Sequence, residues 1–173
     1  MSNFLFDTNV FIQAKNLHYQ FSFCKGFWDW VSEGHAYGLF YSSRKVYAEL
    51  MDGHADDEAR AWAKAIPSSF FLEDSKIEAV MEKYTQVIRW AYQSPQYTDA
   101  AKAEFAQEKI ADAFLIALAK HGGYTIVTQE KSSPDAKKKI FLPDAAKANG
   151  VKTVLVFDLL NSRATSTFQL AVV

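Results

Sequence analysis

Two aspartates and two glutamates are the residues of this sequence best suited to hold a divalent cation. Asp7 directly follows the apolar run 4–6, and Asp112 lies within the apolar stretch 110–119. Burial of a lone carboxylate costs several kcal/mol unless it is paired, hydrogen-bonded or bound to a metal. Mg²⁺ and Mn²⁺ prefer hard oxygen ligands, and a few carboxylates commonly hold them with water and phosphate at the remaining positions. The candidate metal ligands are Asp7, Glu49, Asp112 and Glu130, which would repel one another without a cation.

Each aspartate, taken alone, also has an ordinary structural explanation. Asp7, Thr8 or Asn9 could cap a helix that begins after the first strand. Asp112 could lie on a narrow solvent-facing stripe and pair with Lys109, three residues before it. The local sequence leaves both interpretations open.

The two glutamates carry a weaker signal. Glu49 lies on an amphipathic segment, where most glutamates are solvated surface residues. Glu130 follows the strand-like run 124–128 and could be a loop acid paired with Lys131. The case for these residues depends on their combination with the two aspartates.

Other catalytic chemistries lack their usual motifs here. The single cysteine, Cys24, excludes an internal disulfide and a CxxC metal site, and is typical of a reducing cytosol. The sequence has no GxxxxGK[ST] loop, GxGxxG turn or GxSxG elbow. The four histidines are scattered and have no metal-ligand spacing.

Composition predicts one globular domain over residues 1–173. The chain is 49% hydrophobic, with 7 glycines, 4 prolines and no low-complexity stretch.

A net charge of −1 excludes bulk attraction to polyanions, but residues 109–152 hold eight lysines against four acids, so a local basic surface is plausible. Asp7 interrupts the region that a signal peptide needs to be apolar, and the apolar runs are too short to span a bilayer. We therefore expect a cytoplasmic protein with no membrane partner.

Strand-like and helix-like segments alternate along the chain. The expected strands are residues 3–6, 37–41, 124–128 and 153–157. The expected helices are residues 21–31 with Gly34 as their stop, 43–52 with Ser42-Ser43 as N-cap, 74–92, 110–120 and 143–149. This alternation predicts an α/β fold with a central, mostly parallel sheet between two helical layers. Asp7 and the segment 128–130 would then lie beyond the carboxyl ends of strands, where such sheets place their working residues.

Several of these segments resemble a known family. The run 5–11, LFDTNVF, resembles the opening of PIN-domain proteins, whose first strand ends in an acid followed by a small polar residue. The run 111–119, ADAFLIALA, with the strand 124–128, resembles the third-acid helix of VapC-type toxins, and Glu130 follows Asp112 by the 18 residues common there. Glu49 fits the second acid. The longer string 7–16, DTNVFIQAKN, with 27–30 and 142–144, resembles a less characterised PIN-like branch.

The sequence departs from the PIN pattern in two respects. The fourth acid is Glu130, where the family usually has aspartate. The segment from Asp52 to Pro95 is longer than its equivalent in small VapC toxins, and we expect it to be a helical insertion of about residues 52–95.

The resemblance implies a three-layer α/β/α PIN-like fold and a metal-dependent ribonuclease, the toxin of a type II toxin-antitoxin pair, with a cognate antitoxin and a possible homodimer. Asp7 and Asp112 would bind Mg²⁺ or Mn²⁺ directly, Glu49 and Glu130 would complete the shell, and Asn9 or Thr128 could orient a water. The candidate RNA-binding residues are Lys131, Lys137, Lys138 and Lys139.

Two alternatives remain open. The first is a catalytically weak PIN-like module that binds RNA or a protein partner. The second is a phosphatase of the haloacid dehalogenase type, which is disfavoured because its DxD pair is absent: position 8 is Thr and position 9 is Asn.

Overall fold

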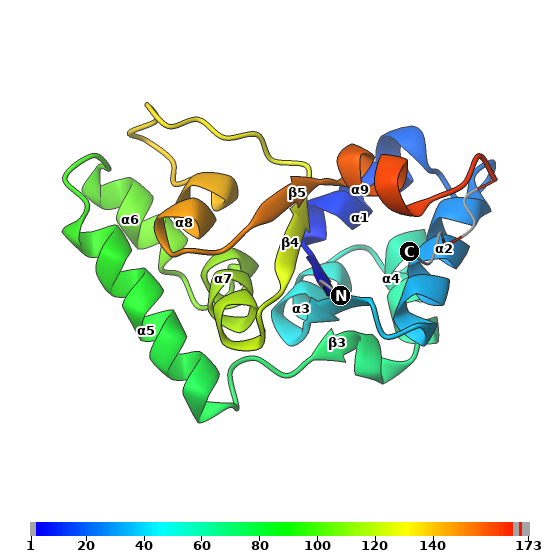
Figure 1. The fold of residues 1–173 in the computed structure, drawn as a ribbon, viewed down its shortest axis with the longest axis horizontal. Coiled ribbons are helices and arrows are strands. Elements are labelled where there is room, and N and C mark those ends of the chain that lie inside the picture. The colour runs from blue at the N-terminus through cyan, green and yellow to red at the C-terminus, as the bar shows by residue number, and fades with distance from the viewer. Residues whose placement is uncertain (1–2, 168–169, 171–173) are drawn as a thin grey trace.

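A five-stranded, all-parallel sheet forms the centre of the computed structural model, which describes residues 3–167 and residue 170 (Figure 1). The strands are β1 (Phe4–Phe6), β2 (Phe40–Ser43), β3 (Phe71–Leu72), β4 (Thr125–Thr128) and β5 (Thr153–Leu155), in the spatial order β3-β2-β1-β4-β5. Strands β2 and β3 follow one another on one side of β1, and the chain then crosses to the other side of β1 to form β4 and β5. Ligands of open α/β sheets bind at such a switch point, which here lies between β1 and β4.

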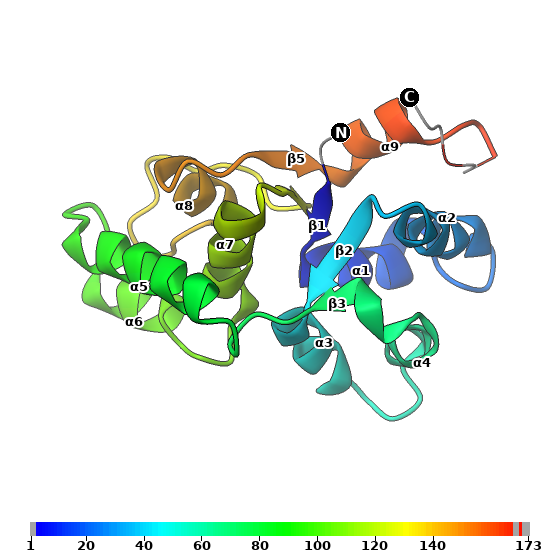
Figure 2. The ribbon, with the colours of Figure 1, turned by 60° about the horizontal axis from the view of Figure 1, so that its bottom comes forward.

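Helices cover both faces of this sheet. The helices are α1 (Thr8–Gln13), α2 (Lys25–Ala36), α3 (Arg44–Met51), α4 (Glu58–Ala65), α5 (Glu78–Gln93), α6 (Asp99–Phe105), α7 (Ala111–Gly122), α8 (Leu142–Ala148) and α9 (Val156–Arg163), with a π-helical turn at Ala14–His18 and a 3₁₀ turn at Ser68–Phe70. Helix α7 lies on one side with α5, α6 and α8 outside it, whereas α1, α2 and α4 lie on the other side (Figures 1 and 2). The predicted three-layer α/β/α architecture is confirmed.

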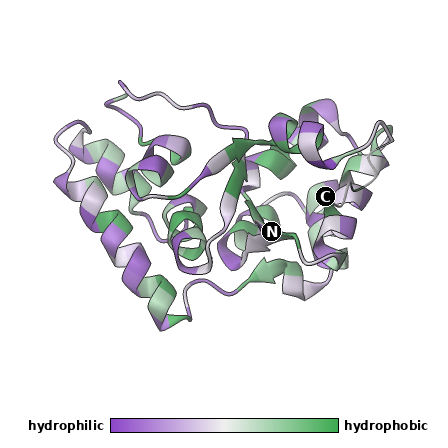
Figure 3. Cartoon of the chain, viewed as in Figure 1, coloured by the Kyte–Doolittle hydropathy of each residue, from purple (hydrophilic) through white to green (hydrophobic). Residues whose placement is uncertain are grey.

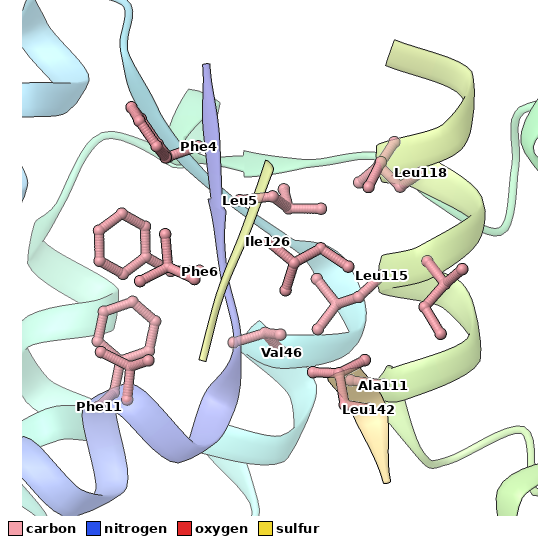
Figure 4. Close-up of a cluster of buried hydrophobic side chains, with 14 of the residues drawn as sticks. Phe4, Leu5, Phe6, Phe11, Val46, Ala111, Leu115, Leu118, Ile126 and Leu142 are labelled. Carbon is pink, nitrogen blue, oxygen red and sulfur yellow. The ribbon is translucent and has the colours of Figure 1, made fainter. Parts of the chain in front are cut away.

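The core follows from the alternation of side chains along the central strands. Leu5 of β1 and Ile126 of β4 are register partners, and both point toward Leu115 of α7 (Figure 4). Phe6 points to the opposite side, where its ring stacks on Phe11 of α1 at 5.9 Å. The central strands are hydrophobic, whereas the outer helix α5 carries many hydrophilic residues (Figure 3). Each face of β1 is therefore buried under its own helical layer.

The sequence predicted the central strands and most of the helices, but the structure differs in several places. Helices α6 and α9 were not expected, and the expected strand 153–157 ends at Leu155, where the chain turns into α9. The segment 52–95 is not wholly helical, because Phe71 and Leu72 pair in parallel with β2 and add an edge strand to the sheet. Two residues are too short a run to show the period of a strand. Gly34 does not stop α2, which continues to Ala36.

Gly34 instead allows a close approach between α2 and β2. A Cβ atom at this position would lie 2.0 Å from the ring of Phe40, which is fully buried. The glycine is therefore required by packing, although it lowers helix propensity. None of the helices that the structure describes combines the length and apolar character that a membrane crossing requires.

We expect Gly34→Ala to destabilise the protein by about 2 kcal/mol, because the clash with Phe40 outweighs the gain in helix propensity. The free energy of unfolding in urea measures this change. Combination with Phe40→Leu, which frees space beside the new methyl group, should cost less than the sum of the two single changes. Additive effects would contradict the packing explanation.

Candidate active site

Asp7 lies at the switch point of the sheet, immediately after β1. Its backbone N–H donates to Val127 O of the adjacent β4 at 3.0 Å, and its side chain is buried. The Thr128 hydroxyl donates to Asp7 Oδ2 at 3.0 Å. The Asp7 carboxylate makes no capping bond to α1, so the helix-cap interpretation is wrong.

Asn9 and Thr128 hold the ends of the two central strands together. Asn9 Oδ1 accepts from the Gln129 backbone N–H at 2.9 Å, and Asn9 Nδ2 donates to Thr128 Oγ1 at 3.1 Å. Thr128 Oγ1 also accepts from the Glu130 N–H at 3.0 Å. These polar atoms are thus engaged within the protein. Asn9 and Thr128 position Asp7 and the chain beyond β4, and the expectation that one of them orients a water stays a prediction.

Asp112 lies in the first turn of α7. Within the described residues its carboxylate has no hydrogen bond and no ion pair, and the expected pairing with Lys109 is absent. The side chain lines a small pocket of about 40 Å³ with Glu104, Lys139 and Ile140 among its walls. An acid in the N-terminal turn of a helix is favourable, but this does not supply the direct partner that a desolvated carboxylate needs.

Glu49 connects three helices around the site. Its Oε1 atom accepts from the backbone N–H of Ala111, the first residue of α7, at 2.9 Å. Its Oε2 atom accepts from the hydroxyl of Thr8 on α1. Helix α7 has no side-chain cap from its own N-cap residue, so Glu49 of α3 supplies one from a distance. Glu49 therefore fixes the helix turn that carries Asp112.

Glu130 repeats the same arrangement at α8. Its Oε2 atom accepts from the backbone N–H of Leu142, the first residue of α8, at 2.8 Å. Its Oε1 atom accepts from Lys139 Nζ, which forms an ion pair with it. The ordinary pairing expected with Lys131 is absent among the described residues, and Lys139 takes that place.

The four carboxylates are close enough to perturb one another. Burial raises the pKa of Asp7 well above its usual 3.8, and the charges of Asp112, Glu49 and Glu130 raise it further against the hydrogen bond from Thr128. Burial also raises the pKa of Asp112 to about 7, with Glu130 and Glu49 adding to this effect and Lys139 opposing it. The four predicted acids therefore lie within electrostatic reach of one another, at the end of β1, on α3, on α7 and in the loop after β4.

The carboxylate oxygens that are free to bind a cation favour a site with fewer than four protein ligands. No group of three or more histidine, cysteine, aspartate or glutamate side chains within residues 3–167 and 170 is arranged to hold a metal ion. Glu49 and Glu130 each use one oxygen to cap a helix and the other to bind Thr8 or Lys139. Asp112 and one oxygen of Asp7, in contrast, have no protein partner in the described residues. Mg²⁺ is commonly held by one or two carboxylates with several waters and substrate phosphates. Asp7 and Asp112 fit that chemistry, with the two glutamates as outer charges.

The four predicted lysines do not form one equivalent group. The side chains of Lys131, Lys137 and Lys138 are exposed and make no ion pair within the described residues, whereas Lys139 is bound to Glu130. The loop that carries them is anchored, because Gln96 Nε2 donates to Ala136 O at 2.7 Å and the Thr98 N–H donates to Lys137 O at 2.9 Å. The loop therefore has a fixed course beside the carboxylates.

Two side chains of the site were missed by the sequence analysis. Thr8 binds Glu49, and Glu104 of α6 lines the Asp112 pocket and adds to the rise in its pKa. Thr8 adjoins Asp7, so its proximity was foreseeable. Glu104 is exposed on the short helix α6, and no sequence signal distinguishes it from other surface acids.

The fold and site define an α/β protein with a carboxylate cluster at the switch point of its sheet. The model of the family described as Domain of unknown function (DUF4411) matches residues 4–167. The chain therefore belongs to the DUF4411 family. No curated protein matches the chain.

We expect Asp112→Asn to stabilise the metal-free protein increasingly as pH rises from about 4 to 8. The native state of the wild type holds the Asp112 proton up to about pH 7, whereas the unfolded state releases it near its usual 3.8, so wild-type stability falls across this interval. The variant lacks this loss, so its free energy of unfolding at pH 8 should exceed that of the wild type by about 1 to 4 kcal/mol. Urea unfolding in chelator at several pH values measures the difference.

Asp29→Asn is the matched control, because Asp29 lies on α2 in an exposed pair with Lys25. This variant should follow the pH dependence of the wild type. Destabilisation by Asp112→Asn at every pH value would show that Asp112 is an ordinary structural acid.

Proposed function

We propose that this protein is a metal-dependent endoribonuclease whose cation is held by Asp7 and Asp112. The observation that carries the proposal is the Asp112 carboxylate, which is desolvated, has no protein partner in the described residues and interacts with the buried Asp7. Two mutually repelling carboxylates with raised pKa values are typical of functional sites, where burial and like charges cluster to shift pKa values. A divalent cation would relieve their repulsion.

The neighbouring residues would position these two ligands. Thr128 orients Asp7 through its hydroxyl, and Asn9 holds Thr128. Glu49 fixes the first turn of α7 and thereby the location of Asp112. Glu130 adds negative charge at the edge of the site, where its bonds to Leu142 and Lys139 favour an outer role.

A bound Mg²⁺ or Mn²⁺ ion would lower the pKa of a coordinated water and neutralise charge on the phosphoryl oxygens. The chain's own residues would provide the binding surface for the substrate. Lys131, Lys137 and Lys138 are exposed on the anchored loop beside the acids, where they can contact phosphates that flank the scissile bond. With a net charge of −1, attraction to RNA would be confined to this local surface.

The resemblance to PIN-domain proteins supports RNA as the substrate and a role as a VapC-like toxin. The motif 5–11 forms most of β1 and the start of α1, and the motif 111–119 forms most of α7. The segments that carry the resemblance therefore also carry Asp7 and Asp112. On this proposal a cognate antitoxin would inhibit the enzyme, and a homodimer is possible.

A specific observation favours a second function. Glu49 and Glu130 are committed to helix caps, and Lys139 already neutralises part of the cluster. These contacts are compatible with a catalytically weak PIN-like module that binds RNA or a protein partner without cleaving RNA.

We expect the purified protein to cleave RNA in Mn²⁺ and not in chelator. Asp7→Asn and Asp112→Asn should each reduce the cleavage rate by about 100-fold or more. Mutation of residues that only support the metal ligands already lowers metal affinity or activity by about 10- to 100-fold, and loss of a direct ligand should cost at least as much. RNA binding, measured by filter retention, should persist in both variants. The assay requires single-stranded and structured RNA over a range of Mn²⁺ concentrations.

Asp29→Asn, prepared in parallel, controls for the general effect of an aspartate-to-asparagine change and should cleave as fast as the wild type. Equal cleavage by all three variants would place the activity outside this site. RNA binding without cleavage by the wild type would favour the binding module.

A further inference from the structure

Lys139 places a positively charged side chain at the carboxylate cluster. Its Nζ atom forms an ion pair with Glu130 Oε1 and lies 4.7 Å from the centre of the Phe141 ring. Its side chain, 49% exposed, lines the same small pocket as Asp112 and Glu104. One acid therefore pairs with this ammonium group, and two more lie near enough to interact with its charge.

The backbone fixes the place of Lys139. Two residues before it, Lys137 O accepts from the Thr98 N–H at 2.9 Å. Three residues after it, the Leu142 N–H donates to Glu130 Oε2 at 2.8 Å. Ile140, the next residue in the chain, is buried and also lines the pocket. The lysine is thus held between two anchors, and its position does not depend on a free loop.

Lys138 provides an internal comparison. It is adjacent in sequence, carries the same charge and is exposed, yet it forms no ion pair within the described residues. One lysine of this pair is directed at the acids and the other is not. A loop that served only to attract RNA would have no need to pair an ammonium group with Glu130 at the pocket that Asp112 lines.

We propose that Lys139 is a built-in counter-cation that competes with the divalent cation for the carboxylate cluster and so sets the affinity of the site for metal. This inference rests on the proposed metal-dependent function. Two cations near the same carboxylates repel each other, and a unit charge about 6 Å from a divalent ion weakens its binding by roughly tenfold even in a medium as polar as water. Removal of the lysine charge should therefore tighten metal binding.

A corollary concerns the lysine after the metal has bound. Repulsion would weaken its pair with Glu130, and the freed ammonium would then lie beside the site, within reach of a substrate phosphate. Lys139 would thus change partner from Glu130 to RNA, whereas Lys131, Lys137 and Lys138 would contact RNA without such an exchange.

The test is a calorimetric titration of Mn²⁺ into the full chain without RNA. We expect Lys139→Met to bind Mn²⁺ about tenfold more tightly than the wild type. Lys139→Arg, which keeps the charge, and Lys138→Met, which removes an equal charge from the neighbouring residue, should both remain within about twofold of the wild type. The double variant Asp112→Asn/Lys139→Met should not bind Mn²⁺ more tightly than the wild type. This result would show that the tighter binding of Lys139→Met occurs at the carboxylate cluster. Circular dichroism verifies the fold of each variant, and Lys139→Gln replaces Lys139→Met if the latter does not fold.

Equal or weaker Mn²⁺ binding by Lys139→Met relative to Lys138→Met would overturn the inference and leave the ion pair with Glu130 as a purely structural contact. Absence of Mn²⁺ binding in every variant would overturn both this inference and the metal-dependent function. If the variants show the expected order of Mn²⁺ affinities but the protein cleaves no RNA, the role of Lys139 is supported and the proposed ribonuclease activity is rejected.

Discussion

The desolvation of two mutually repelling carboxylates, those of the buried Asp7 and the partly buried Asp112, is the constraint on which the organisation of this site depends. Both groups carry raised pKa values because of desolvation and because each lies near other acids. Such an arrangement lowers the stability of the folded protein at neutral pH, since the unfolded chain would ionise both acids freely. The surrounding structure must therefore hold these side chains in place and supply positive potential from elsewhere.

That positive potential comes from helix N-termini and from one lysine. Glu49 binds the first N–H of α7 and Glu130 binds the first N–H of α8, so the negative charges lie at the positive ends of two helix dipoles. Lys139 adds a full charge at the edge of the cluster. These contacts satisfy the glutamates and leave the aspartates as the groups with coordination capacity. The same four acids thus divide into two that support the scaffold and two that are available to a ligand.

The sequence was informative wherever a residue type conflicted with its local surroundings. An acid after an apolar strand and an acid inside an apolar helix predicted Asp7 and Asp112, and alternating patterns predicted the parallel sheet. It was uninformative where tertiary contacts decide the outcome. The role of Gly34 depends on the ring of Phe40, β3 is two residues long, and the pairing of Lys139 with Glu130 depends on how the loop is anchored by Gln96 and Thr98.

The most direct test of the two-aspartate site is a crystal structure of the protein soaked in Mn²⁺, with anomalous scattering recorded to locate the ion. We predict one strong anomalous peak with carboxylate oxygens of both Asp7 and Asp112 at about 2.1 to 2.2 Å, and with Glu49 still bound to the N–H of Ala111. A structure at saturating Mn²⁺ with no peak between these aspartates, and with Asp112 paired to a protein group, would contradict the account.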